Sequence, residues 1–499
     1  GWEGVGLCSY LLIGFWYKKE RANDAAIKAF IVNRIGDIGL ILGVCLIFAH
    51  VGSLDYKDLF LSLPELSQKT ISIVGVHVSL ISLIAFLLFL GAAAKSAQIP
   101  LQFWLPDSME GPTPISALIH AATMVTAGIY MIARLSPFFE QSLYVLDIIL
   151  FIGCLTAISM GLVALVQNDI KRIIAYSTIS QLGYMMAALG ASYYSLAIFH
   201  LMTHAFFKAL LFLCAGSIIL KCNHEQDIDK ISGLKNILPI TYSAFLLASL
   251  SLIGFPLTSG FFSKDMIIEA LKYNGNINSY YILSFSIFIT TLYTLKILIK
   301  VFFGEQKEKA SSELEHDNPI IVPIVLLVIP SIFIGLFFIG PIINDQFFTT
   351  SLIDTPKTNL FYETIVINPI LFSVHSLTSS SFYILILGVL FSYFFYFKKA
   401  KFLILISEKL SFTKNILLSE YGFNNLSNII IPHYFKRFGN FVWNKADKII
   451  IDDVFVNGIG RIINRFSIKI RSLQTGFLYH YAFTMIVSLI IFLLVFYDY

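Results

Sequence analysis

The sequence predicts an all-α polytopic membrane protein. Three observations lead to this fold class: the composition, a series of long apolar stretches, and the uneven distribution of basic residues between the loops. Of the 499 residues, 57% are hydrophobic and 13% are charged, and the mean hydropathy is +0.78. Soluble proteins lie far from these values. The 46 Phe and 24 Tyr residues argue against disorder, and a net charge of +4 argues against nucleic acid as a partner.

The chain begins at Gly1 inside an apolar run, GWEGVGLCSYLLIGFWY, with no Met or basic segment before it. A signal peptide has a basic segment before its apolar part, so we expect a fragment that starts within a membrane helix. The five cysteines are scattered without a CxxC or Cys/His cluster. They predict no disulfide framework, iron–sulfur centre or zinc site.

Twelve stretches are long and apolar enough to cross a membrane, since a spanning helix needs about 20 apolar residues. The loops rich in Lys and Arg all fall on one side, which the positive-inside rule identifies as cytoplasmic or matrix. The opposite loops, at 136–142, 191–193 and 342–379, contain only Lys357 as a basic residue other than His. The expected spans are 1–17, 25–49, 74–97, 112–135, 143–167, 170–190, 194–220, 237–270 (long and interrupted), 279–303, 318–341, 380–397 and 479–497.

A different pattern occupies residues 434–473, where apolar residues recur at helical spacing and Lys or Arg residues occupy the other faces. It predicts a helix along the membrane surface, about 60 Å long at 1.5 Å per residue. Gly458 and Gly460 are expected to bend or divide it. Two roles are open, an amphipathic lipid anchor or a brace across partner subunits.

Ionisable residues within spans carry the strongest functional signal, because each is costly there unless it is paired or hydrated. Glu3 lies in the first span, Arg34 and Asp37 lie one turn apart in the second, and His120 lies in the fourth. The simpler interpretation of Arg34 and Asp37 is an ion pair that locks helices together. His120 fits either a core histidine or a proton carrier.

His200, His204 and Lys208 follow one another at i, i+4 and i+8 in the span 194–220. At 100° per residue they fall within an arc of about 80°, so they predict a polar stripe that faces the protein interior. Asp169, at the mouth of the span 170–190, has the simpler interpretation of a charged loop cluster with its basic neighbours.

Lys95 and Lys264 stand beside stretches rich in helix breakers, SAQIPLQFWLPDSMEGPTP and IGFPLTSGFFSKD. Breaks in corresponding parts of two halves indicate discontinuous helices, which line ion sites in transporters because broken backbone needs protein or water around it. The alternative is that both stretches are surface loops that happen to flank lysines.

These residues suggest a mechanism, because a buried lysine can gain and lose a proton whereas arginine cannot. A carboxylate such as Glu3 at about 8 Å would change the energy of the Lys95 charge by roughly 2 kcal/mol at an effective dielectric near 20. Its movement would switch Lys95 between holding and releasing a proton. The stripe would extend the relay through water toward Lys264. We find no sequence motif for an electron carrier, a nucleotide or a redox metal.

Seven segments cover residues 1–265 densely: the opening run, NRIGD, KSAQIPLQFWLPDSMEGPTPISALIHAATMVTAG, QNDIKRIIAYSTISQLGYM, FHLMTHAFFKALLFLCAGS, HEQDI and GFFSKD. Together they resemble the antiporter-like membrane subunits of proton-pumping NADH:quinone oxidoreductase, respiratory complex I. The C-terminal part, with LQTGFLYHYAF before the last span, resembles the L type, the counterpart of mitochondrial subunit 5.

The resemblance implies two inverted five-helix repeats, each with one discontinuous helix, followed by further helices and a lateral helix. The implied domains are 1–135 (remainder of the first repeat), 136–303 (second repeat), 304–399 (additional transmembrane helices), 400–478 (amphipathic lateral helix region) and 479–499 (terminal transmembrane helix).

The resemblance also implies residue roles and partners. It assigns proton translocation to Glu3, Lys95, Lys208 and Lys264, a proton relay to His120, His200 and His204, and support to Asp37, Arg34 and Asp169. It implies no cofactor in this chain, since NADH, FMN, iron–sulfur clusters and quinone belong to other subunits. The implied partners are the M-, N- and K-type membrane subunits, contacted by 434–473, and the lipid bilayer. The implied location is the bacterial cytoplasmic membrane, with the mitochondrial inner membrane as the alternative.

Two other functions are open. The large subunit of an Mrp-type cation/proton antiporter resembles this chain in most of these motifs and works without redox chemistry. It continues into further spans, whereas this chain ends at Tyr499 after one. A purely structural membrane scaffold would not need lysines within its spans.

Overall fold

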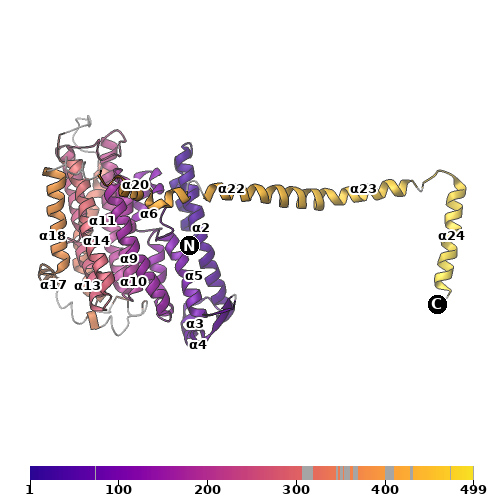
Figure 1. Cartoon of the computed structure of the whole chain (residues 1–499), viewed down its shortest axis with the longest axis horizontal. Coiled ribbons are helices and arrows are strands. Elements are labelled where there is room, and N and C mark those ends of the chain that lie inside the picture. Colours follow the sequence, from indigo (N-terminus) through magenta and orange to yellow (C-terminus); the bar gives the residue numbers. More distant parts are fainter. Residues whose placement is uncertain are drawn as a thin grey trace. The chain divides into compact units, whose positions relative to one another are not determined.

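The computed structural model describes residues 1–73, 75–305, 318–343, 347–348, 352, 360–362, 369–398, 409–427, 431–472 and 474–497. It divides into two units, Gly1–Phe423 and Asn424–Tyr499. The first unit is a bundle of helices (Figure 1), and all of the ionisable residues singled out above lie in it.

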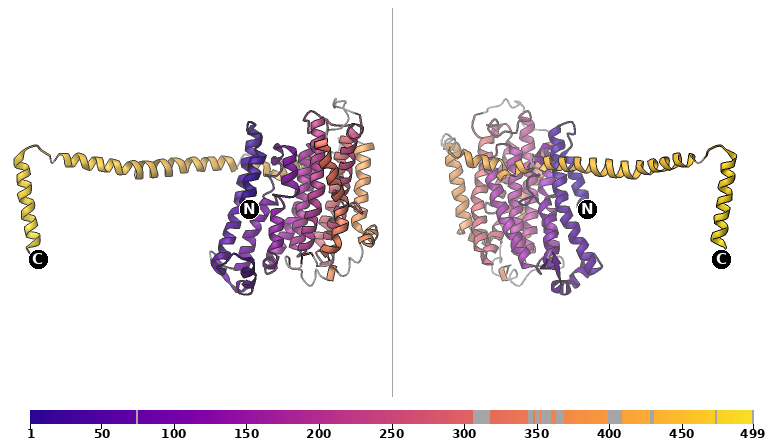
Figure 2. Two further views of the ribbon diagram at one scale, coloured as in Figure 1. Left: turned by 180° about the vertical axis from the view of Figure 1, so that it is seen from behind. Right: turned by 45° about the vertical axis from the view of Figure 1, so that its right-hand side comes forward.

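The first helices form a layer in which α2 and α5 pack side by side, with two short helices and a β-hairpin at one end (Figure 2). The expected span 74–97 starts too early, because Thr70–Ile73 and Val76–Ser79 pair as antiparallel strands. Alternating β-branched residues favour strands there, and Gly75 supplies a φ of +82°. The elements are α1 (Trp2–Ile13), α2 (Glu20–Val51), α3 (Tyr56–Leu61), α4 (Leu63–Gln68), β1 (Thr70–Ile73), β2 (Val76–Ser79) and α5 (Leu80–Lys95).

The expected span 112–135 is not one helix, because it divides between Ala121 and Ala127. The hydroxyl of Thr123 donates to Leu118 O at 2.8 Å and that of Thr126 donates to Ala122 O at 2.8 Å. These bonds compete with the helical pattern at the break. The elements are η1 (Asp107–Glu110), α6 (Thr113–Ala121), α7 (Ala127–Arg134), α8 (Ser136–Phe139), α9 (Leu143–Val166), α10 (Ile170–Gly190) and α11 (Tyr194–Lys221).

The interruption expected within 237–270 is confirmed. One helix ends at Ile253, Gly254 adopts φ +84°, and the next helix starts at Ser259, since glycine accepts the left-handed conformation that closes a helix. The elements are η2 (Leu234–Asn236), α12 (Pro239–Ile253), α13 (Ser259–Tyr273), α14 (Ile277–Phe302), α15 (Asn318–Ile343), α17 (Pro369–Ser376), α18 (Ser380–Ser392), the π-helix η3 (Tyr393–Lys398), α20 (Ser411–Leu418), η4 (Glu420–Gly422) and α21 (Phe423–Asn425).

Seven helical segments among the described residues are long and apolar enough to cross a membrane by themselves. Three further apolar helices, α1, α5 and α12, are shorter. The seven are Glu20–Val51, Leu143–Val166, Tyr194–Lys221, Ile277–Phe302, Asn318–Ile342, Ser380–Phe397 and Leu478–Phe496.

Helix α10 lies at the centre of the bundle, and every one of its residues except Arg172 is buried. Glycines allow its backbone to approach α9 closely. A Cβ at Gly183 would lie 2.6 Å from the Ala157 nitrogen, and one at Gly153 would lie 2.5 Å from the Ala187 nitrogen. Such small residues let membrane helices pack backbone to backbone, which fixes the position of the polar side chains on α10.

The second unit contains a long helix followed by a terminal one (Figure 1). Of the two effects expected of Gly458 and Gly460 on the long helix, a division does not occur, because helical structure continues from Ile431 to Arg471. Gly458 follows a π-helical stretch, where a Cβ would lie 3.1 Å from Asp453 O, so glycine relieves crowding at the return to α-helix. The elements are α22 (Ile431–Val442), η6 (Trp443–Val456), α23 (Asn457–Arg471) and α24 (Leu478–Phe496).

Candidate functional site

The first cluster of charges surrounds Lys95, the last residue of α5, whose side chain is 1% exposed. Its Nζ lies 3.6 Å from Asp37 Oδ2 and 5.8 Å from the centre of the Trp2 ring. The Trp2 indole N–H donates to Asp37 Oδ1 at 2.7 Å. Lys95 Nζ has no hydrogen-bond partner among the described residues. A buried ammonium therefore faces a carboxylate that another side chain holds in place.

Glu3 and Arg34 form the outer part of this cluster, with Arg34 Nη1 2.7 Å from Glu3 Oε2. The expected ion pair between Arg34 and Asp37 is not formed, because Arg34 reaches Glu3 while Asp37 turns toward Lys95. Gly6 leaves a space beside the Lys95 ammonium and the Glu3 carboxylate. A Cβ at Gly6 would lie 3.0 Å from Lys95 Nζ and 4.0 Å from Glu3 Oε2.

His120 lies on α6 and is fully buried. Its Nε2 is 2.9 Å from the Ser108 hydroxyl, and its ring packs against Phe212 with centroids 5.3 Å apart. Nδ1 has no partner among the described residues. The buried ring therefore keeps one nitrogen available for a proton or a water molecule.

The stripe on α11 faces the interior as expected, since His200, His204 and Lys208 are all 0% exposed. The two histidine rings are 6.2 Å apart. His204 Nδ1 lies 3.4 Å from Ala121 O, the carbonyl at the end of α6. The stripe therefore contacts the interruption between α6 and α7.

Three residues of α10 contact the titratable groups of α11 and α13. Lys208 Nζ donates to Ser177 Oγ, Gln181 Oε1 lies 3.0 Å from His200 Nε2, and the Tyr184 ring lies 4.9 Å from Lys264 Nζ. The sequence analysis missed Ser177, Gln181 and Tyr184. Their spacing of i, i+4 and i+7 would have placed them on one face of the predicted helix.

Lys264 belongs to α13, one turn after its start, and is fully buried. Its Nζ has no hydrogen-bond partner among the described residues. The preceding residue, Ser263, completes the bridge to α11, since its hydroxyl is 2.8 Å from His200 Nδ1 and 2.7 Å from Thr203 Oγ1. His200 is thus held on one nitrogen by α10 and on the other by α13.

A further buried lysine, Lys296 of α14, was also missed by the sequence analysis, and its ammonium contacts backbone carbonyls of a neighbouring helix. Its Nζ donates to Leu165 O at 2.9 Å and to Gln167 O at 2.6 Å. These carbonyls lie at the C-terminal end of α9, where a cation satisfies groups that the helix leaves without partners. Lys296 therefore caps α9.

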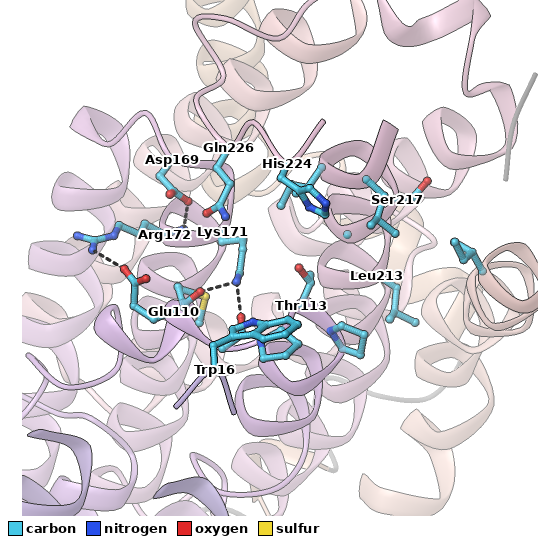
Figure 3. Close-up of a pocket in the computed structure, with 18 of the residues that line it drawn as sticks. Trp16, Glu110, Thr113, Asp169, Lys171, Arg172, Leu213, Ser217, His224 and Gln226 are labelled. Atoms are coloured by element: carbon cyan, nitrogen blue, oxygen red, sulfur yellow. Dashed lines mark hydrogen bonds and ion pairs between the residues drawn. The ribbon is translucent and has the colours of Figure 1, made fainter. Parts of the chain in front are cut away.

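Asp169 is the N-cap of α10, and its carboxylate accepts the Arg172 backbone N–H at 3.0 Å. Burial raises the pKa of the Asp169 carboxyl above its ordinary value, while this hydrogen bond and the Arg172 charge oppose the increase. Asp169 also lines a cavity of about 740 Å³. Lys171, Trp16 and His224 lie around the same space, and Lys171 Nζ donates to two backbone carbonyls (Figure 3).

Comparison with known proteins shows which family this chain belongs to. Residues 1–290 match the family described as "NADH:quinone oxidoreductase/Mrp antiporter, TM". NADH-quinone oxidoreductase subunit L of Neisseria meningitidis serogroup A is 43% identical over 520 residues, which cover 99% of this chain and 77% of that protein. The chain belongs to the NADH-quinone oxidoreductase subunit L family. NADH-ubiquinone oxidoreductase chain 5 of Phytophthora infestans is also 43% identical, over 98% of this chain and 74% of that protein.

This chain shares its fold with a chain of a solved Mrp complex. The structure of an Mrp complex from Dietzia sp. DQ12-45-1b contains a chain with a TM-score of 0.63 and 22% identity. The match covers 99% of this chain and 48% of that chain, so this chain spans about half its length. At this identity the likeness concerns the fold alone.

Proposed function

We propose that this chain is a proton-translocating membrane subunit of NADH-quinone oxidoreductase, in which quinone reduction elsewhere in the complex drives protons through buried side chains. The observation that carries the proposal is the set of fully buried titratable groups, Lys208, His200 and Lys264, gathered against one face of α10. A buried charge has a high energetic cost in a membrane protein, so its presence indicates a functional role. Membership of the subunit L family supports the same function.

The cluster of Lys95 and Asp37 is the proposed switch. At 3.6 Å and an effective dielectric near 20, the two charges interact with on the order of 4 kcal/mol. Loss of this interaction, by movement of Asp37 or by transfer of a proton to it, would favour release of the Lys95 proton. Glu3 and Arg34, in the outer part of the cluster, would control the switch. When Arg34 moves away from Glu3, the space at Gly6 lets Glu3 approach Lys95.

The proposed relay runs through His200. A neutral imidazole donates from one nitrogen and accepts on the other, and here Ser263 and Gln181 occupy the two positions. A proton that arrives at one nitrogen can leave from the other if water bridges the remaining gaps. Lys208 lies on one side of this histidine along α11 and Lys264 lies next to Ser263 on α13. In this proposal His120, His204 and Asp169 support the same path.

The remaining assignments follow from family membership. We propose that the chain itself holds no cofactor, because NADH, FMN, iron–sulfur clusters and quinone are bound by other subunits. The proposed domains are those that the resemblance to the family implies, with the second repeat at 136–303. The proposed location is a bacterial cytoplasmic membrane, and the proposed neighbours of the segment 434–473 are the M-, N- and K-type subunits.

The second candidate function, cation/proton antiport without redox chemistry, is favoured by the fold shared with the Mrp complex. Inverted membrane vesicles that contain the assembled complex separate the two. Addition of NADH is expected to acidify the vesicle interior, and deletion of this chain is expected to reduce the protons moved per NADH oxidised. If deletion left NADH-driven acidification intact and abolished Na⁺/H⁺ exchange instead, the antiporter function would replace the first.

The brace proposed for residues 434–473 predicts a loss of assembly. A Gly/Ser insertion beside Gly458 interrupts a helix that continues from Ile431 to Arg471, so the distal membrane arm is expected to dissociate in native gels. NADH oxidation by the peripheral arm should persist. The same insertion after Gly476, outside the helix, is the control. Unchanged assembly and pumping at Gly458 would favour the lipid anchor.

A further inference from the structure

A buried carboxyl lies just before the second unit begins. Glu420 belongs to the short helix η4, which follows α20, and its side chain is 1% exposed. Three consecutive residues here, Glu420, Tyr421 and Gly422, have positive φ values of 51°, 57° and 89°. For residues other than glycine this conformation is strained, and it persists only where surrounding contacts enforce it. Specific contacts must therefore hold this turn in place.

The contact of Glu420 is with the central helix of the bundle. The Tyr176 hydroxyl of α10 donates to Glu420 Oε1, and Tyr176 is fully buried. The next residue of the turn makes a separate contact, since the Tyr421 hydroxyl donates to Ser159 O of α9 at 3.2 Å. The turn is therefore fastened to two helices, α10 and α9.

The point of contact on α10 is also the place where Lys208 is held. Lys208 Nζ donates to Ser177 Oγ and lies 3.5 Å from Ile174 O. These two acceptors flank Tyr176 on a single helical turn. A displacement or rotation of Tyr176 would move both acceptors, because the backbone of one helical turn moves as a unit.

A turn that is held by a buried carboxyl has a high desolvation cost. An apolar side chain of similar volume often gives equal or greater stability, whereas a buried ionisable group has a high desolvation cost. A charge at this position acts on its surroundings in a way that an apolar residue cannot.

We propose that Glu420 is a positioning residue for the central lysine. Through Tyr176 it holds the turn of α10 that carries both acceptors of Lys208, and it links the segment leading into Asn424–Tyr499 to that lysine. The inference rests on the proposed function of Lys208 in proton translocation.

The test compares Glu420→Met and Tyr176→Phe in the assembled complex. Methionine keeps the length of the Glu420 side chain and removes the carboxyl oxygen that accepts from Tyr176, and phenylalanine removes the hydroxyl that donates. Each variant is expected to lower the protons moved per NADH oxidised toward the value of Lys208→Ala. The double variant should be no lower than either single one, because both remove the same hydrogen bond. Additive losses would overturn the inference.

Tyr421→Phe is the matched control, since it removes a hydrogen bond from the same turn to α9 and leaves the contact with α10. It is expected to keep the wild-type ratio of protons to NADH. An equal loss in this control would mean that the turn acts only as an anchor, and would overturn the inference. If Lys208→Ala itself pumped normally, the proposed function would fail. If only Lys208→Ala lowered the ratio, the role of Glu420 alone would fail.

Discussion

Replacement of Lys208 by arginine is expected to abolish pumping through this subunit nearly as completely as Lys208→Ala does. The variant retains the positive charge and approximate reach of the side chain, but a guanidinium does not release its proton at cellular pH. Lys208 is fully buried, and its ammonium donates to Ser177. Protons moved per NADH oxidised in inverted vesicles measure the effect.

Lys296→Arg is the control for this experiment. Lys296 is another buried lysine, but its ammonium donates to the carbonyls of Leu165 and Gln167 at the end of α9, and arginine can also donate to carbonyls. The Lys296→Arg variant is expected to move nearly as many protons per NADH oxidised as the wild type. Near-normal pumping by Lys208→Arg would show that a fixed charge suffices at this position and would exclude the relay role.

Neutralisation of Asp37 is expected to impair pumping more strongly than neutralisation of Glu3. Asp37 lies 3.6 Å from Lys95 Nζ, so Asp37→Asn removes an interaction on the order of 4 kcal/mol and keeps the side-chain volume. Glu3 is ion-paired with Arg34 and is partly exposed, so Glu3→Gln acts on Lys95 less directly. Lys95→Ala should reduce pumping as strongly as Asp37→Asn does.

The measurement is again the ratio of protons moved to NADH oxidised, with subunit content checked by native gel. All three variants are expected to assemble, because they change charge in a polar cluster rather than apolar packing. Lys69→Ala is the control, since it removes a solvent-facing ion pair with Glu65 of the kind that contributes little. A preserved ratio in Asp37→Asn and Lys95→Ala would contradict the switch.

Composition and periodicity by themselves determined the fold class and most of the candidate residues, and the resemblance of the motifs to a known family indicated the family. Apolar length defines membrane helices because lipid cannot satisfy a free backbone, and the interruption near Gly254 was visible from its glycine and proline neighbours. The inward orientation of His200, His204 and Lys208 followed from helical spacing alone. Local chemistry is sufficient for such features, because each depends on residues that are close in the sequence.

The pairing of the charged groups was decided only by the tertiary structure. Asp37 had an equally good partner in sequence, Arg34, but helix packing turns it toward Lys95, 58 positions away. Ser177, Gln181 and Tyr184 are unremarkable in a sequence and become significant because α10 lies between α9, α11 and α13. The contact between Glu420 and Tyr176 joins residues 244 positions apart. Contacts of this kind depend on which helices pack together, and hydrophobic periodicity does not specify that choice because most apolar faces are interchangeable in lipid.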